Sequence, residues 1–477
     1  MTIFFRYGFG MAARFVNIDY DTPLMLAPNL RDWVPADHLA HFILDAVQEM
    51  ELHGLKVNER GTGSPQYPPR MLLALLFYCY ATGVSSARRI EQATHDSVPV
   101  RMICADTHPD HDTICTFRRE NQALLQEAFV RVLEMAQALK FLRVGQITVA
   151  VDGTKVMAHA SKHAAVSYAH AGKTIQQLEL EIQALLTKAE QADSTPLQDG
   201  LSIPAEITRR QERKAALQKA RAEIEARARA RHALELAEHE QKLAERAARK
   251  ERGQGLSGRP PQAPTPEPEP GDQYNFTDPE SRIMKAGSGQ HFEQSYNAQA
   301  AVEVESRLIV GERVSQAPND KQQLVPTVAT IIAPVESVAA VLADTGFYSE
   351  AAVQAVEHSS AGQPTGTTVY AALEKTGHYR TVSDLEKREE PAAPGLGASL
   401  GEVMKHRLKT AAGKAKYNLR KQTVEPVFGI IKSVLGFRQF LLRGLQKVGL
   451  EWQLVCLAYN LKRLHIMGAG LKVAARA

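Results

Sequence analysis

Apolar residues recur at helical spacing through the first third of the chain. The clearest case is an almost unbroken apolar run over residues 71–84, which follows Pro68 and Pro69, and prolines at this place are typical of a helix start. A later helix is predicted over residues 112–140, where apolar positions fall three and four apart. We expect residues 1–140 to form an all-helical N-terminal domain.

A short turn separates the apolar run from the next predicted helix. Gly83 ends the run, and Ser86 can cap a helix over residues 87–93 that carries Arg88 and Arg89. Two helices joined by a glycine turn have the outline of a helix-turn-helix, in which these arginines would bind DNA. Any two packed helices share that outline, so both interpretations stay open.

Strand-like patterns begin after this helical region. Residues 146–153 are rich in β-branched residues and end in Asp152 and Gly153, a pattern that predicts a buried strand followed by a turn. Residues 338–344 repeat the pattern and end in Asp344. Two strands that each end in an aspartate are candidates for one shared site, because neighbouring strand ends can bring their side chains together.

More strands and a helix follow. Residues 296–304 and 308–314 predict a hairpin around a turn at residues 305–307. Residues 368–372 predict another short strand, and residues 321–332 predict a helix. Strands that alternate with helices indicate an α/β core.

A long polar segment interrupts this core. Residues 174–252 are predicted to form a helical hairpin or coiled-coil arm, in which Glu206–Arg252 carries fourteen basic and nine acidic residues. Residues 253–272 contain GRPPQAPTPEPEPG and predict a Pro-rich linker. We therefore divide the α/β core into residues 141–173 and residues 273–477, and expect the second part to end in basic helices.

Charge is uneven along the chain. The net charge is only +4, but thirteen Lys and Arg residues and two acids, Glu425 and Glu451, lie between Lys405 and His465. Such a basic surface fits a polyanion, and nucleic acid is the obvious partner. The alternative is an ordinary solvated face.

The cysteines and the hydropathy of the chain indicate where in the cell the protein is expected. None of the four cysteines belongs to a Cys-x-x-Cys pair, so reduced thiols and a cytoplasmic protein are expected. The N-terminal residues lack the sustained apolar core of a signal peptide, and no stretch reaches about eighteen apolar residues. We expect no membrane span.

Three acids are candidates for chemistry: Asp152, Asp344 and Glu425. Each signal is weak alone, since Asp-Gly after a strand is usually a turn and an acid among bases is usually an ion-pair partner. Together, two strand-end carboxylates and one from a packed helix can hold a hard divalent cation such as Mg²⁺. Two such ions can activate the attacking oxygen and stabilise the leaving oxygen in phosphoryl transfer, while basic residues hold a DNA backbone.

The residues around Glu425 resemble a known signature. Residues 417–432, YNLRKQTVEPVFGIIK, are similar to the Tyr-Arg-Glu-Lys signature of DDE transposases encoded by bacterial insertion sequences. Tyr417 and Lys432 match its tyrosine and lysine, and six residues separate Glu425 from Lys432, as in the family pattern.

The basic residue of the signature departs from the family pattern by one position. Four residues separate Arg420 from Glu425 where the family has three, and Lys421 occupies the expected place. At about 100° per residue, Lys421 shares a helix face with Glu425 and Arg420 points to the other side. This argument fails if Pro426 makes the helix begin only near Thr423.

Other segments carry the same resemblance. YPPRMLLALLFYCYATGVSSARRIEQ and TICTFRRE are similar to the N-terminal helical domain of this superfamily, VAVDGTKV to its first-acid strand, and LADTGFYSE to its second-acid strand. The resemblance implies an RNase H-like catalytic domain, a mixed sheet flanked by helices, into which the polar arm is inserted.

The resemblance also implies an activity. A transposase of this kind uses two Mg²⁺ ions, for which Mn²⁺ can substitute, to cleave the ends of the element and to transfer the freed 3′-hydroxyls into target DNA. The three acids would hold the metal, and the chain would act on DNA as a homodimer. The residues implied to contact DNA phosphates are Tyr417, Arg420 or Lys421, and Lys432.

Three rival interpretations explain less of the sequence. An aspartic protease would need a second Asp-Thr-Gly besides the one at residues 344–346, and there is none. A non-catalytic DNA-binding regulator explains the charge but not the three acids. A coiled-coil scaffold explains the arm but neither the strands nor the C-terminal signature.

Overall fold

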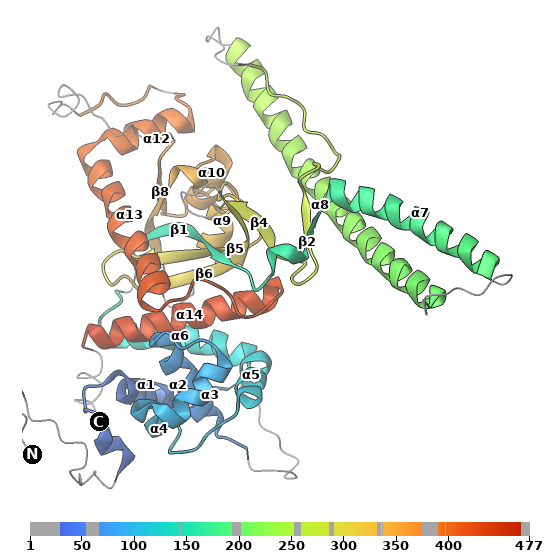
Figure 1. Cartoon of the computed structure of the whole chain (residues 1–477). Coiled ribbons are helices and arrows are strands. Elements are labelled where there is room, and N and C mark those ends of the chain that lie inside the picture. The colour runs from blue at the N-terminus through green and yellow to red at the C-terminus, as the bar shows by residue number, and fades with distance from the viewer. Residues whose placement is uncertain are drawn as a thin grey trace, which may run out of the picture.

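The computed structural model has three parts, namely a helical bundle, a sheet covered by helices, and a long arm that projects from the sheet (Figure 1). The residues that it describes are 29–53, 66–143, 145–192, 202–251, 259–285, 291–331, 335, 337–373, 390–395 and 397–468. None of the helices in these ranges is both long and apolar enough to cross a membrane. The four cysteines are free thiols, as predicted. The N-terminal residues that lack a signal-peptide pattern lie outside the described ranges.

The N-terminal part is a helical bundle. After a short 3-10 helix (η1, Leu30–Trp33), its helices are α1 (Leu39–Glu49), α2 (Pro69–Ala81), α3 (Ala87–Asp96), α4 (Val98–Ile103), α5 (His111–Glu120) and α6 (Gln122–Ala138). α2 begins at the predicted prolines and has buried residues on every side. A helix that is apolar all round belongs inside a fold, and α2 is the centre of the bundle.

One predicted helix is in fact two. α5 and α6 meet at Asn121, whose backbone leaves the helical region and whose side-chain amide donates to the Phe117 carbonyl at 2.9 Å. The prediction of a single helix over residues 112–140 is therefore wrong. The physical reason is that an asparagine side chain competes for the backbone hydrogen bonds that a helix needs.

A mixed sheet forms the core of the second part. Its strands are β1 (Ile147–Met157), β4 (Arg282–Lys285), β5 (Phe292–Glu303), β6 (Ile309–Ser315), β7 (Val338–Ala343) and β8 (Thr368–Ala371). Their order is β4-β5-β1-β7-β8, and β6 also pairs with β5. β1 lies at the centre, antiparallel to β5 and parallel to β7, which is parallel to β8. The predicted α/β core and the β5–β6 hairpin are confirmed.

β1 does not end at its aspartate. It passes Asp152 and Gly153, and residues 149–157 all pair with β5. The predicted turn after Asp152 is wrong, because the antiparallel partner satisfies the backbone along the whole segment. Glycine is needed at position 153 for another reason: a Cβ there would stand 2.2 Å from Gln299 Nε2 and 2.7 Å from Asp320 Oδ1.

Helices cover the sheet. They are α9 (Leu324–Val328), α10 (Glu350–Glu357), α12 (Leu400–Lys409), α13 (Ala411–Gly429) and α14 (Leu445–Ile466), with a 3-10 turn at Thr345–Phe347 and a π-helical turn at Ile430–Val434. Of the helix predicted over residues 321–332, the described residues up to 331 form only α9. Thr330 bonds back to the Thr327 carbonyl through its N–H and its hydroxyl, which ends the α-helical pattern.

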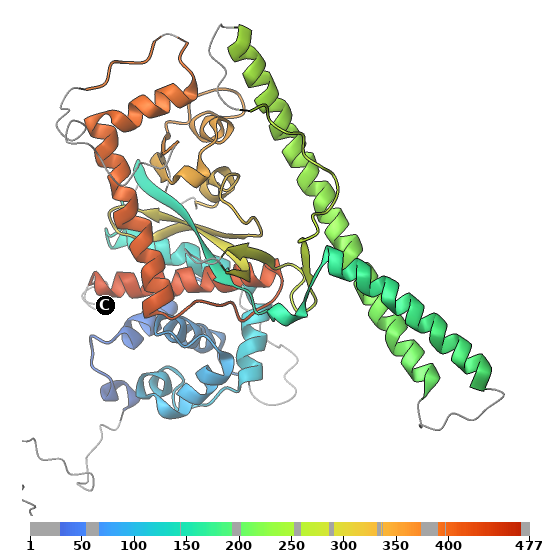
Figure 2. The same cartoon turned by 45° about the horizontal axis from the view of Figure 1, so that its top comes forward.

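α14 lies between the sheet and the N-terminal bundle (Figure 2). It contacts β6 on one side and α2 and α6 on the other. Its buried residues therefore surround the helix, and the largest of them, Trp452, donates from Nε1 to the Gln299 carbonyl at 3.0 Å. This helix joins the two parts into one hydrophobic core.

A buried charged network fixes α14 to the bundle. Glu451 is fully buried, and its Oε2 accepts the backbone N–H groups of Leu441 and Leu442, both at 2.9 Å. The Tyr80 hydroxyl lies 3.4 Å from Glu451 Oε1, and Arg118 Nη1 lies 3.9 Å from it. Arg118 also donates to the Tyr80 oxygen at 2.6 Å. Burial raises the pKa of Glu451, against the opposing effects of Arg118 and of the hydrogen-bond donors.

The arm is a helical hairpin, as predicted. α7 (Tyr168–Ala192) and α8 (Ile203–Glu251) pack side by side in opposite directions, and a small sheet of β2 (Ala165–Ser167) and β3 (Gln273–Asn275) closes its base. The arm has a small core of its own, formed by Val166, Ala171, Ile175, Leu217, Ala220, Ile224 and Tyr274. α8 continues beyond α7 and runs along the edge of the sheet (Figure 1).

Candidate active site

The three predicted acids lie at one place and come from three elements. Asp152 is in β1, Asp344 follows directly after β7, and Glu425 is in α13. β1 and β7 are parallel neighbours with Val151 opposite Ala343, so the two aspartates lie side by side. α13 contacts both strands and adds the glutamate.

Arg420 of α13 occupies the space between the acids. One of its terminal nitrogens, Nη1, lies 3.7 Å from Asp152 Oδ2. The other, Nη2, lies 3.6 Å from Asp344 Oδ1 and 3.5 Å from Glu425 Oε1. Charge-assisted hydrogen bonds are typically about 2.7–2.9 Å long, so these ion pairs are loose. Arg420 Nε is buried and has no hydrogen-bond partner among the described residues.

Exposure differs sharply within the cluster. The Arg420 side chain is 7% exposed and that of Asp152 is 21% exposed. The side chains of Asp344 and Glu425 are 50% and 51% exposed. The arginine therefore forms the floor of the site and the acids form a rim that is open to a large substrate.

Asp152 has a strongly shifted pKa. Burial raises the pKa of Asp152 to about 7. The Gly153 N–H, which donates to Asp152 Oδ1 at 2.8 Å, and the Arg420 charge both lower that pKa. The charges of Asp344 and Asp320 raise it. Positive charge placed between these carboxylates would favour their ionised form.

The structure separates the two candidate cations of the signature. Arg420 points into the acid cluster, whereas Lys421 is exposed on α13. The expectation that Lys421 shares the site with Glu425 is therefore not met. A helical wheel gives only the direction in which a side chain leaves the helix, and the long arginine side chain reaches back to the acids.

α13 is continuous through Pro426, so the alternative in which this helix begins near Thr423 is wrong. Pro426 lacks an N–H donor, and the helix widens into the π-helical turn shortly after it. Tyr417, on the same helix, is half-buried and its ring centroid lies 6.0 Å from Arg420 Cζ, a cation–π distance. This contact places Tyr417 at the edge of the acid cluster.

A further acid, Asp320, lies near Asp152. The N-cap of α9 is Gln323, and Asp320 Oδ1 accepts 2.7 Å hydrogen bonds from the amides of Asn297 and Gln299. These amides are buried and need an acceptor. Asn297 and Gln299 stand at alternate positions of a buried strand, so both side chains face the same side of the sheet. Two buried polar side chains on one face are a sequence pattern that could have indicated a nearby acceptor such as Asp320.

Two lysines lie on the β1 side of the cluster. Lys432 Nζ donates to the Lys155 carbonyl at 2.8 Å, which ties the π-helical turn to β1. Burial lowers the pKa of Lys432 and also that of Lys155. The Lys155 ammonium is buried and has no hydrogen-bond partner among the described residues. Lys432 thus braces the strand that carries Asp152.

The donor set of the cluster fits a divalent metal ion in its chemistry. Carboxylate oxygens are the ligands that Mg²⁺ prefers, and the cluster supplies them from three elements. In the described ranges, no three His, Cys, Asp or Glu side chains stand close enough together to hold a metal ion. The distances are those of carboxylates arranged around the Arg420 guanidinium.

The predicted DNA-binding arginines of the bundle lie elsewhere. Arg88 and Arg89 are exposed on α3, which follows α2 after a turn with Gly83 at φ 85°. α3 belongs to the bundle, on the far side of α14 from the sheet (Figure 1). A helix-turn-helix and a plain pair of packed helices both fit this arrangement.

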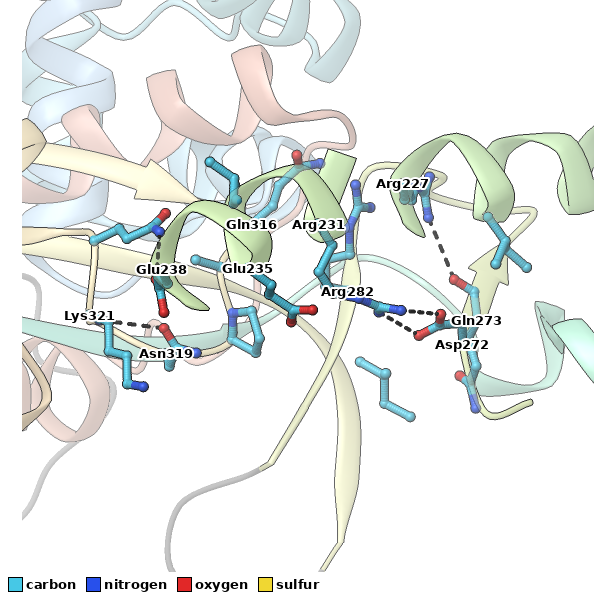
Figure 3. Close-up of a pocket in the computed structure, with 16 residues that line it drawn as sticks. Arg227, Arg231, Glu235, Glu238, Asp272, Gln273, Arg282, Gln316, Asn319 and Lys321 are labelled. Carbon is cyan, nitrogen blue, oxygen red and sulfur yellow. Dashed lines mark hydrogen bonds and ion pairs between the residues drawn. The ribbon is translucent and has the colours of Figure 1, made fainter. Parts of the chain in front are cut away.

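A cavity of about 500 Å³ lies where α8 meets the edge of the sheet (Figure 3). Arg231 pairs with both oxygens of Asp272 at 3.1 Å, and Arg282 donates to three backbone carbonyls. Gln322 Nε2 donates to Glu238 Oε1 of α8 at 3.1 Å. These cations already have protein partners, so we interpret the cavity as the joint between arm and sheet.

Two segments of the chain match known protein families. Residues 28–120, which contain α1 to α5, match the family described as Transposase domain (DUF772). Residues 397–465, which contain α12, α13 and most of α14, match the family described as Transposase DDE domain. Both are transposase domains. The matches support a transposase of the DDE type, a class of protein that binds DNA.

The matches cover only part of the site. The Transposase DDE domain match contains Glu425 and Arg420, whereas Asp152, Asp344 and the arm lie outside both matched segments. No curated protein and no solved structure matches the chain. The assignment of the two aspartates to the site therefore rests on the geometry of the sheet and not on the family matches.

Proposed function

We propose that this chain is the DNA transposase of a bacterial insertion sequence, which cleaves the ends of the element and joins them to target DNA. The observation that carries the proposal is the meeting of Asp152, Asp344 and Glu425 at one buried arginine. These acids lie far apart in the sequence, and their convergence in a solvent-open site is what metal-dependent phosphoryl transfer requires. The two transposase-domain matches support the same class of activity.

We infer that the sheet is RNase H-like. Support comes from its central strand, which is antiparallel to β5 on one side and parallel to β7 on the other, and from its helical cover. In this arrangement the first and second acids lie on adjacent parallel strands. The helix that bears the third acid, α13, contacts both of these strands and so brings Glu425 to the two aspartates.

Each residue of the cluster has its own part in the proposed reaction. The three acids would hold two Mg²⁺ ions, or Mn²⁺ in their place, which when bound supply an activated attacking oxygen and a stabilised leaving oxygen. Arg420 would bind a phosphate oxygen near the cleaved bond, with Tyr417 packed against its guanidinium. Lys432 holds β1 in place through the Lys155 carbonyl.

Other parts of the chain would contact DNA away from the cleaved bond. Lys409, Lys414 and Lys421 are exposed along α12 and α13 and would contact the phosphate backbone. Arg88 and Arg89 would do so from the bundle. We propose that two copies of the chain act together on two DNA ends in the cytoplasm, where free thiols stay reduced.

The test is cleavage of DNA that carries the element's own ends, with Mg²⁺ or Mn²⁺. We compare wild type with Asp152→Asn, Asp344→Asn and Glu425→Gln, and with Asp112→Asn, whose side chain is 86% exposed on α5, as the matched control. We expect the three site variants to lose cleavage by about a thousandfold or more while still binding DNA, and the control to cleave normally.

A wild-type protein that binds the ends and never cuts them would overturn the proposal. It would favour the alternative, a DNA-binding regulator without catalysis, to which the guanidinium between the acids also lends support. Normal cleavage by any of the three site variants would remove that acid from the mechanism.

A further inference from the structure

Asp320 lies close to two glycines that follow the aspartates of the site. Gly153 follows Asp152, and a Cβ on Gly153 would stand 2.7 Å from Asp320 Oδ1. Gly346 lies two residues after Asp344, and a Cβ on Gly346 would stand 3.9 Å from Asp320 Oδ2. The carboxylate of Asp320 therefore lies between Gly153 of β1 and Gly346, which closely follow the two aspartates in the sequence.

A buried polar cradle holds this carboxylate. Asn297 and Gln299 are fully buried, and both donate to Asp320 Oδ1 at 2.7 Å. Their own carbonyl oxygens, Asn297 Oδ1 and Gln299 Oε1, have no hydrogen-bond partner in the described residues. Lys155 lies opposite Asn297 in the sheet, and its ammonium group also has no hydrogen-bond partner in the described residues.

Such unpartnered buried groups indicate that something binds among them. Leaving a buried polar atom without a hydrogen bond is unfavourable, and most such atoms in proteins bond to protein or to ordered water. Arg420, which pairs with Asp152, is also almost fully buried, and its Nε has no hydrogen-bond partner in the described part of the chain. Ordered water at the cluster would satisfy both the amide oxygens and the N–H donors, whereas a cation would satisfy only the oxygens.

The loop that carries Asp320 is held from the outside as well. Gln316 Nε2 donates to the Glu280 carbonyl at 2.6 Å, and Gln322 Nε2 donates to Glu238 of α8 at 3.1 Å. Figure 3 shows Gln316, Asn319 and Lys321 of this loop beside Glu238 of α8. The arm therefore helps to fix the loop, and with it the position of the carboxylate.

We propose that Asp320 is a fourth carboxylate of the acid cluster and that it strengthens the binding of divalent cations there. Its role is that of a positioning residue: anchored by Asn297 and Gln299, it adds negative charge next to Asp152 and accepts hydrogen bonds from the hydration shell that Mg²⁺ normally keeps. The proposal rests on the proposed function, because it assumes that the three acids bind metal.

The test measures Mn²⁺ binding to the full chain by calorimetry, together with cleavage of DNA ends. Asp320→Asn keeps the shape of the side chain and removes its charge. We expect it to bind Mn²⁺ about ten- to a hundredfold more weakly than wild type, with cleavage reduced to match and partly restored at high Mn²⁺ concentration. Asp112→Asn serves as the exposed control, and thermal unfolding checks that each variant folds.

The outcomes separate the two proposals. If wild type binds Mn²⁺ and Asp320→Asn binds it equally well, the role of Asp320 is refuted and the proposed function stands. If wild type neither binds Mn²⁺ nor cleaves DNA, the proposed function itself fails. Should Asp320→Asn fail to fold, Asn297→Ala tests the positioning instead, because it removes one anchor of the carboxylate and leaves its charge in place. We expect this variant to bind Mn²⁺ more weakly than wild type, and equal binding would refute the positioning role.

Discussion

Two arginines in this molecule are almost equally buried, but the acids that they face differ in their exposure to solvent. Arg118, at the joint between bundle and sheet, is 5% exposed, and Arg420, in the acid cluster, is 6% exposed. Arg118 faces Glu451, a fully buried acid that is also hydrogen-bonded by two backbone N–H groups. Arg420 faces three acids, of which Asp344 and Glu425 are about half exposed.

The difference lies in the acids and in their access to solvent. A buried pair whose acid is held by backbone donors has no capacity left for a ligand, so it acts as a structural joint. Open acids that are only loosely paired with a buried cation can instead bind a metal ion, and the cation is then free to bind a phosphate. The burial of the arginine alone would not have distinguished the joint from the candidate site.

The largest effect on the free energy of unfolding is expected at the joint between the bundle and the sheet. Arg118→Leu leaves Glu451 buried without its cation, and we expect a loss of about 3–5 kcal/mol in the free energy of unfolding, measured with urea. Arg420→Leu is the matched variant, and we expect it to cost less than about 1 kcal/mol because two of its three acids, Asp344 and Glu425, are half exposed. Equal losses from the two substitutions would contradict the comparison.

The next effect concerns activity at the open cluster. Arg420→Leu is expected to lower the rate of DNA cleavage about a hundredfold, since the substrate loses a charge-assisted contact at the reacting phosphate. Lys421→Leu, one position along α13, should change that rate by less than about threefold and should only weaken DNA binding slightly. A larger loss from Lys421→Leu than from Arg420→Leu would reverse the assignment of the signature's basic residue.

The last prediction concerns the pH dependence of stability at Asp152. The pKa of Asp152 is raised from 3.8 to about 7 in the folded chain, so folding favours its protonated form. That contribution is complete below about pH 4 and is lost as pH rises through about 7. As pH rises from about 4 to about 7, Asp152→Asn should therefore gain stability relative to wild type, by about 1.4 kcal/mol for each pKa unit of the shift. The measurement is the free energy of unfolding in the presence of EDTA. A pH-independent difference would show that the pKa of this acid is not shifted.

Local patterns predicted most of the elements. The prolines before α2, the β-branched runs of β1 and β7, and the polar periodicity of α7 and α8 each determine their element through short-range geometry. Two predictions failed for different reasons. β1 continues past Asp152 because β5, which is distant in the sequence, pairs with it. α5 ends at Asn121 because the side chain of this residue bonds to a backbone carbonyl in the preceding turn, a local contact that the apolar periodicity does not reveal.

The sequence by itself determined which residue types could do chemistry: two aspartates after β-branched runs, a glutamate in a basic segment, and a nearby tyrosine, arginine and lysine. Only the tertiary structure decided how they combine. Parallel pairing of β1 with β7 brought Asp152 beside Asp344, the path of α13 selected Arg420 over Lys421, and two amides of β5 placed Asp320 near them. The physical reason is that a local pattern sets the direction in which a side chain leaves the backbone, whereas its partners depend on how the strands and helices pack.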